Sequence, residues 1–157
     1  MAEVVSTMVQ VHIARKVSEL MWEHLIVRRA PHEAVFPLQW QVVTGRIEQG
    51  ETATQAAMRE LTEETGLHHE HFWVLPFVSS LYSPRRDSIV HVPVFGVTVD
   101  NSLPVLLSDE HCEHQWITAN QANDILTIPA QQHAMRLFDD MLRNKWDDAR
   151  FNDVYKL

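Results

Sequence analysis

Apolar positions recur along the chain at two spacings, and the spacing changes where the expected elements change. Valine and isoleucine take every second position between Met8 and Ala14, which predicts a half-buried strand. Further apolar runs predict strands at Leu20–Arg29, Trp40–Val43, Phe72–Tyr82, Ile89–Val99, Leu103–Leu107 and Glu113–Ile117. Spacings of three and four predict helices between Thr52 and Gly66, at Ala119–Ile125 and at Ala130–Trp146. Such a mixture of strands and helices is expected to form an α/β sandwich.

The connections between these segments predict how the strands pair. Few residues separate the first two strands, so they are expected to be antiparallel neighbours. A turn at 83–87 makes the segment 72–99 a long hairpin, with Pro76 at an edge or a bulge. The prolines of Ala30–Pro37 indicate a loop, and Asp147–Leu157 is expected to be a tail with a weak strand.

The helix between Thr52 and Gly66 has start and stop signals of its own. Thr52 is a suitable N-cap, and Gly66 follows the last turn as a C-terminal stop. Small and aliphatic residues repeat along one side, which predicts that this side faces a sheet; they are Ala53, Ala57 and Leu61. The small residues are expected to let the helix sit close to that sheet.

Three carboxylates lie close together on this helix. Glu60, Glu63 and Glu64 are spaced so that they cover an arc of roughly 100°. Their like charges repel each other, whereas a divalent cation would reverse the sign of that interaction. Mg²⁺ prefers carboxylate oxygens and commonly binds together with substrate phosphates. Arg59 lies beside the arc rather than within it, and we expect it to pair with Glu51 in a structural role. The alternative interpretation is a solvated acidic helix surface.

The whole stretch follows one long and rigid pattern, G-x5-E-x7-R-E-U-x-E-E-x-G-U, where U is aliphatic. The chain matches every fixed position: Gly45, Glu51, Arg59, Glu60, Leu61, Glu63, Glu64, Gly66 and Leu67. It therefore resembles the Nudix hydrolases, whose box has this pattern. Many members have Pro-Gly before the first glycine, where this chain has Val43-Thr44. The segment Trp40–Gly45 is similar to that of members that hydrolyse dihydroneopterin triphosphate and deoxynucleoside triphosphates.

The resemblance implies a fold and a metal site. The fold is a Nudix-type α/β/α sandwich with a mixed sheet, formed by residues 1–157 as one domain. The metal is Mg²⁺, with Mn²⁺ as the other option. Its ligands are the carboxylates of Glu60, Glu63 and Glu64 and the carbonyl of Gly45. Glu63 and Glu64 are also candidates for the catalytic base.

The loop before the expected strand at 113–117 supplies another candidate. In the family, an acid in such a loop often serves as a metal ligand or the catalytic base. Glu110 is at the matching position, with Glu113 as the alternative. Both acids also fit simple surface positions. We expect Trp116 in the core, and we assign no function to the ten histidines.

Three residues outside the box are candidates for substrate binding, each with a structural alternative. Arg28 closes an expected strand together with Arg29, and it fits either a strand-end charge or a phosphate clamp. Trp40 fits the core or a stacking contact with a base. Arg85, in the turn of the hairpin, fits a phosphate contact or a solvated charge.

Composition and charge narrow the range of partners. A chain of 157 residues, 45% hydrophobic and 22% charged, suits one globular domain. The net charge of −8 disfavours nucleic acid but not a small phosphorylated substrate, because bound cations can supply the opposing charge. Cys112 is the single cysteine and we expect no signal peptide, which fits the cytoplasm. The longest apolar stretch, Ile89–Val99, is too short to cross a bilayer, so no membrane partner is expected.

Together these patterns predict hydrolysis of a phosphoanhydride by direct attack of water, since no nucleophile with a partner base is evident. The expected substrate is a small nucleotide-like molecule. It is a (deoxy)nucleoside triphosphate or dihydroneopterin triphosphate, which gives a monophosphate and pyrophosphate. Two alternatives stay open: a hydrolase of dinucleoside polyphosphates, nucleotide sugars or RNA 5′ ends, and a non-catalytic nucleotide sensor. The complete carboxylate set disfavours the sensor. The resemblance also leaves a homodimer open without fixing an interface.

Overall fold

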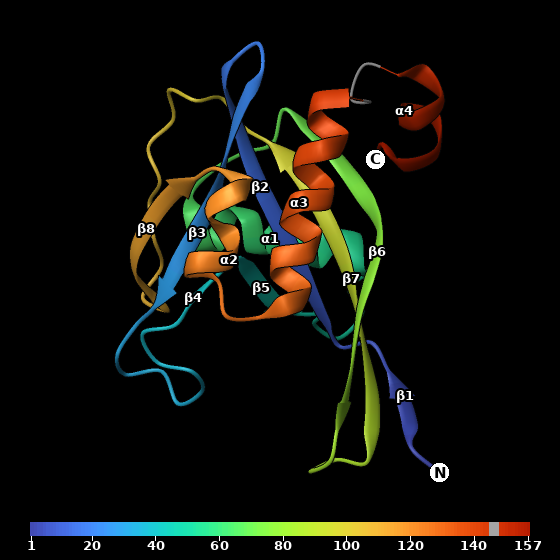
Figure 1. Cartoon of the computed structure of the whole chain (residues 1–157). Coiled ribbons are helices and arrows are strands. Elements are labelled where there is room, and N and C mark those ends of the chain that lie inside the picture. Colours follow the sequence, from blue (N-terminus) through green and yellow to red (C-terminus); the bar gives the residue numbers. More distant parts are fainter. Residues whose placement is uncertain (145–147) are drawn as a thin grey trace.

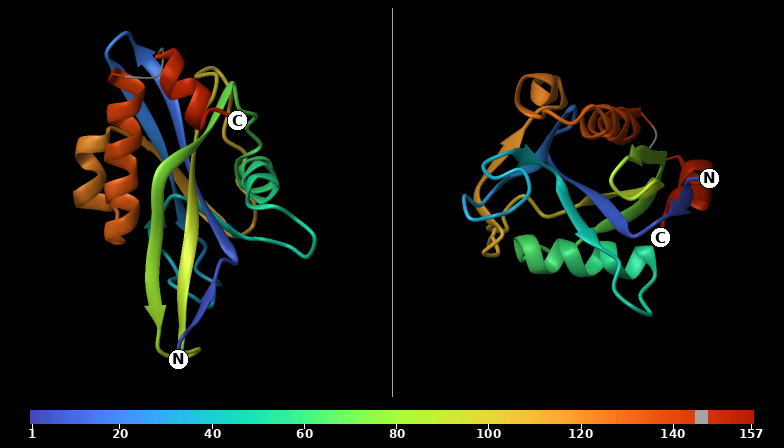
Figure 2. Two further views of the ribbon diagram at one scale, coloured as in Figure 1. Left: turned by 90° about the vertical axis from the view of Figure 1, so that its right-hand side faces the viewer. Right: turned by 90° about the horizontal axis from the view of Figure 1, so that it is seen from below.

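In the computed structural model, which describes residues 1–144 and 148–157, eight strands form one mixed sheet. The strands are β1 (Glu3–Val5), β2 (Met8–Ser18), β3 (Met21–Arg29), β4 (Trp40–Gln41), β5 (Val43–Arg46), β6 (His71–Ser83), β7 (Ser88–Thr98) and β8 (His111–Ile117). The helices are α1 (Ala53–Thr65), α2 (Ala122–Ile125), α3 (Pro129–Asn144) and α4 (Ala149–Tyr155), with a 3₁₀ turn at Ala119–Gln121. Helix α1 lies on one face of the sheet, and α2 and α3 lie on the other (Figures 1 and 2).

Strand β2 is at the centre of the sheet. It pairs antiparallel with β3 and β5 and parallel with β7. Beyond these neighbours, β3 pairs antiparallel with β4 and β8, while β7 pairs with β6 and β1. Parallel and antiparallel pairs in one sheet, with helices on both faces, confirm the expected α/β/α sandwich with a mixed sheet.

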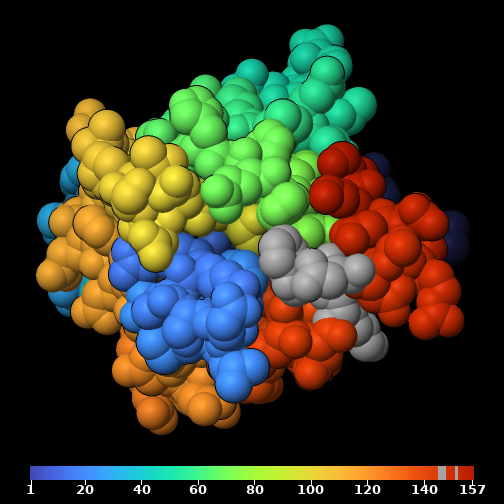
Figure 3. Space-filling model, turned by 90° about the horizontal axis from the view of Figure 1, so that it is seen from above, coloured from blue at the N-terminus to red at the C-terminus, as the bar shows by residue number. Residues whose placement is uncertain are grey.

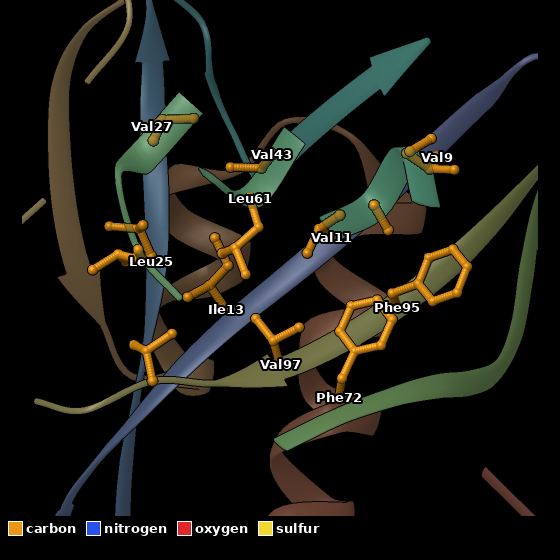
Figure 4. Close-up of a cluster of buried hydrophobic side chains, with 14 residues drawn as sticks. Val9, Val11, Ile13, Leu25, Val27, Val43, Leu61, Phe72, Phe95 and Val97 are labelled. Atoms are coloured by element: carbon orange, nitrogen blue, oxygen red, sulfur yellow. The ribbon is translucent and has the colours of Figure 1, made fainter. Parts of the chain in front are cut away.

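Because helices cover both faces of the sheet, the central strands are buried on both sides. Val11 and Ile13 of β2 join Leu61 of α1 in the cluster between the sheet and that helix (Figure 4). On the opposite face, Phe138 of α3 packs directly over β7 at Gly96, where a Cβ would lie 2.6 Å from the nearest ring carbon. Burial on two sides makes this region a rigid support for whatever α1 carries.

The long hairpin of β6 and β7 is confirmed, and of the two options expected at Pro76, an edge or a bulge, the strand pairing shows an irregularity there. The register between the two strands shifts between Val74 and Val78. The distal half of the hairpin extends beyond the helices, with β1 beside it (Figure 1). Figure 3 shows the opposite end of the domain. This end is covered by side chains of the β2–β3 turn, of the segment after β7 and of the C-terminal region.

The strand expected at Leu103–Leu107 is wrong. This segment crosses the C-terminal end of α1, where the N–H of Leu106 donates to the carbonyl of Thr65 at 2.8 Å. Val105 and Leu107 pack against the core, so their apolar character reflects burial without strand pairing.

The weak strand expected in the tail is reduced to a single bridge, because a helix takes most of this segment. Residues 149–155 form helix α4, and the side chain of Asp148 caps it by accepting a hydrogen bond from the N–H of Arg150 at 2.9 Å. One isolated bridge, between Trp73 and Lys156, follows the helix. Trp146 and Asp147, which the sequence placed in the last helix and the tail, lie outside the described residues.

Two further expectations need correction. The strand expected at Trp40–Val43 is divided, because β4 pairs with β3 and β5 with β2. Between them, the N–H of Val42 donates to Oε1 of Gln131 at 3.0 Å. Trp116 is half-buried at the margin of the core rather than within it, and the Arg15 guanidinium lies 4.3 Å from its ring centre. Within residues 1–144 and 148–157, none of the helices has the length and apolar character needed to cross a bilayer.

Candidate active site

The ends of α1 are fixed by its own sequence. Oγ1 of Thr52 accepts a hydrogen bond from the N–H of Gln55 at 3.2 Å, and Oε1 of Gln55 accepts from the N–H of Thr52 at 2.9 Å. This capping box begins the helix, and Gly66 ends it in the left-handed conformation with φ of 68°. Both ends match the sequence prediction. With both ends fixed, the rotation of the helix decides where each carboxylate lies.

The glutamates of α1 differ in exposure. The side chains of Glu60 and Glu64 are 10% and 6% exposed, whereas that of Glu63 is 56% exposed. Glu60 and Glu64 are one turn apart and lie against the protein, while Glu63 projects toward solvent. The sequence predicted one arc of three carboxylates, and the structure shows that the arc runs from the protein interior to the surface.

Gly45 and Glu60 are in direct contact. A Cβ built on Gly45 would lie 1.9 Å from Cδ of Glu60 and 2.0 Å from its Oε1. The Glu60 carboxylate therefore occupies the space that any other residue at position 45 would need. Burial raises the pKa of Glu60, opposed by the hydrogen bond and the charge of Arg59. A partly desolvated carboxylate of this kind gains most from a cation beside it.

Arg59 connects three glutamates. Its Nε and Nη2 donate to the two carboxylate oxygens of Glu51 at 2.9 and 3.0 Å, which confirms the expected pair. Its Nη1 donates to Oε1 of Glu60 at 2.8 Å and to Oε2 of Glu63 at 2.9 Å. The prediction that Arg59 stays outside the carboxylate arc is therefore wrong, because its guanidinium binds both Glu60, the next residue, and Glu63, one turn later. The hydrogen bond from Arg59 holds the pKa of Glu51 below its ordinary value.

Glu64 is held from the other side by a loop that the sequence did not connect to it. Its Oε2 accepts a hydrogen bond from Oγ of Ser108 at 2.6 Å and lies 2.7 Å from Nδ1 of His111. Nε2 of Gln41, which can only donate, lies 3.3 Å from Nε2 of His111. A neutral His111 therefore accepts at Nε2 and donates from Nδ1 to Glu64.

These contacts determine the charge of Glu64. Burial alone would raise the pKa of Glu64, but the hydrogen bonds from His111 and Ser108 and the charge of Arg29 leave it below the ordinary value. Glu64 is thus an ionised, oriented carboxylate at neutral pH. His111 and Ser108 were missed as site residues; their position in the loop that contains Glu110 was the available signal.

Glu110 lies in the same loop, but its backbone makes the contacts. Its N–H donates to Oγ of Ser108 at 3.3 Å, and its carbonyl accepts from the N–H of Ala30 at 2.8 Å. Glu110 is exposed, and within the described residues its side chain makes no hydrogen bond or ion pair. The other acid considered, Glu113, pairs with Arg28. The structure brings Glu110 near Glu64 through the loop and leaves its side chain in solvent.

Arg28 and Trp40 lie together beside the loop at 30–39. Nη1 of Arg28 donates to Oε2 of Glu113 at 2.6 Å, and its Nε donates to the carbonyl of Leu38 at 3.0 Å. The guanidinium carbon lies 5.9 Å from the ring centre of Trp40. Trp40 is half-buried and packs against a cluster under α2 and α3. Both residues therefore have clear structural contacts, and their roles in substrate binding remain predictions.

The two other arginines near strand ends differ in their relation to the carboxylates. Arg29 donates to the carbonyl of Val35 and to Glu33, both at 2.7 Å, and its charge reaches Glu64. Arg85 is exposed in the turn between β6 and β7, and this end of the hairpin is well separated from α1 in Figures 1 and 2. The structure thus brings Arg29 toward the candidate site and leaves Arg85 apart from it.

The residue types of this site fit a hard divalent cation, since carboxylate oxygens are its preferred ligands. As the side chains lie, no group of three His, Cys, Asp or Glu residues within 1–144 and 148–157 is arranged around one point. The reason is visible in the contacts: Arg59 binds Glu60 and Glu63, while His111 and Ser108 bind Glu64. The ligand set fits in kind, and Arg59 must yield part of its contacts when the carboxylates turn to an ion.

Comparison with known proteins agrees with this geometry. The NUDIX domain family matches residues 17–139. An octanoyltransferase of Myxococcus xanthus is 38% identical over 119 residues, which are 71% of this chain and only 31% of that protein. The nucleoside triphosphatase NudI of Salmonella arizonae is 24% identical over 121 residues, 73% of this chain and 86% of that protein. This chain thus spans about a third of the first protein and most of the second.

A solved structure shows the same fold. The C. elegans Ap4A hydrolase in a binary complex superposes with a TM-score of 0.70 at 24% identity, covering 88% of this chain and 97% of the other. The box, the sandwich and the family match agree. The chain therefore belongs to the NUDIX family, whose members are phosphoanhydride hydrolases that act on nucleotide-like substrates and generally use a divalent metal.

Proposed function

We propose that this chain is a Mg²⁺-dependent pyrophosphohydrolase of (deoxy)nucleoside triphosphates or dihydroneopterin triphosphate. Hydrolysis would give a monophosphate and pyrophosphate. One observation carries the proposal: three carboxylates of α1 lie on one arc, and one of them, Glu60, packs so closely on Gly45 that no side chain fits at position 45. The likeness to a nucleoside triphosphatase over most of both chains supports this substrate class.

Glu60, Glu63 and Glu64, with the carbonyl of Gly45, would hold the ion, for which Mn²⁺ is the other option. When bound, the ion neutralises phosphate charge and lowers the pKa of a water molecule. The protein's part is to supply oriented, ionised oxygens. Glu60 is oriented by its contact with Gly45, and Glu64 by Ser108 and His111.

The proton of the attacking water needs an acceptor near the carboxylates. Glu64 is suited to this task because it is ionised at neutral pH. Both of its hydrogen bonds given above end on Oε2, so Oε1 is the atom that can face an ion or take a proton. Glu63 and Glu110 are more exposed and remain the other candidates for the base.

The substrate's phosphates must approach the same arc. Arg59 becomes available to them when the carboxylates turn to the ion, because its Nη1 is shared between Glu60 and Glu63. For the organic part of the substrate, we retain Arg28 and Trp40, which lie together beside the loop at 30–39. Arg85 is retained as a distal phosphate contact without support from its position.

A panel of phosphoanhydrides with Mg²⁺ tests the proposal. It contains deoxynucleoside triphosphates, dihydroneopterin triphosphate, a dinucleoside polyphosphate, a nucleotide sugar and RNA with a 5′ triphosphate. Release of pyrophosphate from the triphosphates is expected, and Glu64→Gln should lower turnover by at least about 100-fold with an unchanged Tm. The control Glu19→Gln changes a carboxylate that is 93% exposed and pairs with Lys16, and it should leave turnover unchanged. Full activity of Glu64→Gln would refute the site assignment.

A further inference from the structure

The distal part of the β6–β7 hairpin forms an arm that leaves the body of the domain. The β arm consists of β1, residues 78–83 of β6 and residues 88–92 of β7. β1 pairs parallel with β7 and β6 pairs antiparallel with it. Figure 2 shows the helices beside the other half of the sheet, so the arm is a three-stranded ribbon with little support. An isolated two-stranded hairpin is marginally stable at best in water, so the arm depends on its third strand and its apolar face for stability.

One face of the β arm is apolar and uncovered. The strand register places Val4, Ile89 and Tyr82 in one row across the three strands. Val78, four residues before Tyr82 in β6, lies on the same face because side chains alternate along a strand. Val4, Val78 and Tyr82 are 61%, 54% and 57% exposed. Large apolar side chains gathered on one surface in this way indicate an interaction site.

The outer edge of β6 is closed at one end only. Near the body, the C-terminal segment covers it: Trp73 pairs with Lys156, and the N–H of Leu157 donates to the carbonyl of Phe72 at 2.8 Å. Along residues 78–83, the only strand pairing within the described part of the chain is with β7. The outer edge there presents backbone N–H and C=O groups that another strand can pair with.

The absence of charged residues along this edge indicates which strand can pair with it. Neither His71–Ser83 nor Ser88–Thr98 contains an aspartate, glutamate, lysine or arginine. The whole chain carries a net charge of −8, so two copies repel each other over most of their surfaces. Exposed edges of monomers usually carry charges that prevent pairing. This edge has none, which favours a second copy of the same chain.

The sequence of the edge is also complementary to itself. In an antiparallel pair centred on Ser80, Val78 lies opposite Tyr82 of the partner subunit, and the same contact repeats on the other side of the axis. Ser79 lies opposite Leu81 of the partner subunit. Aromatic and β-branched residues in opposite positions are a favourable cross-strand pair. The pairing would join the apolar rows of the two arms into one continuous face.

We infer that two copies of this chain form a twofold dimer through antiparallel pairing of residues 78–83 of β6, centred on Ser80. The dimer extends one mixed sheet across both subunits. It involves no residue of the carboxylate site, so it holds or fails independently of the proposed function.

A charge at position 80 tests the inference. Ser80 is exposed, and its Oγ lies 2.7 Å from Nδ1 of His91, its cross-strand neighbour in β7, so substitution should preserve the fold. Sedimentation velocity at micromolar concentrations should give the wild type a mass of twice 18.2 kDa. Ser80→Lys and Ser80→Asp each place like charges against each other on the twofold axis and should each sediment at 18.2 kDa.

Mixing the two variants should restore the dimer, because the opposite charges then meet across the axis. A misfolded variant could not be rescued in this way. The control Leu20→Lys replaces a side chain that is 79% exposed in the β2–β3 turn, and it should remain dimeric. In hydrogen exchange, the amides of 78–83 that point away from β7 should be protected in the wild type and exchange faster in Ser80→Lys. A wild type that stays at 18.2 kDa, or a Ser80→Lys variant that stays dimeric, would overturn the inference.

Discussion

A substitution at the contact between Gly45 and Glu60 should separate an effect on activity from an effect on stability most clearly. In Gly45→Ala, the new Cβ would lie 1.9 Å from Cδ of Glu60, whereas ordinary contacts begin near 3.4 Å. The carboxylate must therefore move by at least about 1.5 Å. The atoms in conflict are Cγ, Cδ and Oε1 of one flexible side chain, so a change of its rotamer can relieve the conflict without a shift of the β5 backbone.

The expected result is a large loss of turnover with a small loss of stability. Displacing a functional group by 1 Å can lower a rate by roughly 100-fold, and we expect a loss of at least that size for Gly45→Ala. Gly50→Ala is the matched control, because nothing lies within 4 Å of its new Cβ while its φ of +82° is strained for alanine. That strain costs about 1 kcal/mol, which corresponds to a fall in Tm of about 2–4 °C, with turnover retained.

The assay combines Mg²⁺-dependent release of pyrophosphate with thermal unfolding for each variant. The double variant Gly45→Ala/Glu60→Ala adds a test of mechanism. If Gly45→Ala acts only through Glu60, the double variant should be no less active than Glu60→Ala alone. Equal activity of Gly45→Ala and the wild type, or a further loss in the double variant, would refute the reasoning.

Two other perturbations test the electrostatics of the fold and of the site. His12 is fully buried, and burial lowers its pKa from 6.5 to about 3, so between these values only the unfolded chain binds this proton. This group should therefore lower the free energy of unfolding by about 3 kcal/mol between pH 6.5 and pH 4. Urea unfolding at several pH values should show a smaller dependence of that free energy on pH in His12→Gln than in the wild type. An equal dependence in the two proteins would contradict the reasoning. Arg59→Met leaves Glu60 and Glu63 beside each other without a cation, so the Tm in EDTA should fall by about 4–8 °C. Added Mg²⁺ should raise the Tm of that variant more than that of the wild type, and an equal rise would show that the ion does not replace the guanidinium.

Contacts encoded within α1 and its flanks could be predicted from the sequence. Thr52 and Gly66 mark its ends through local chemistry, and the pairing of Arg59 with Glu51 needs only the loop that precedes the helix. The same nearness explains one error. Arg59 is the neighbour of Glu60 and one turn from Glu63, so nothing in the sequence decides which carboxylates its five N–H groups reach.

Contacts between distant segments could not be predicted in this way. Ser108 and His111 meet Glu64 across 44 and 47 residues, because α1 and β8 come together only when the sheet forms. Burial without pairing produced the wrong strand at Leu103–Leu107, since an apolar run that packs on a core reads like a strand. These cases share one cause: periodicity reports which side is buried and not what covers it.

The central claim is that the box glutamates hold a divalent cation, and Mn²⁺ binding followed by electron paramagnetic resonance tests it most directly. The wild type should bind the ion. The folded triple variant Glu60→Gln/Glu63→Gln/Glu64→Gln should not, because it keeps the shape of the site and loses its charge. Equal binding of Mn²⁺ by the two proteins would contradict the account.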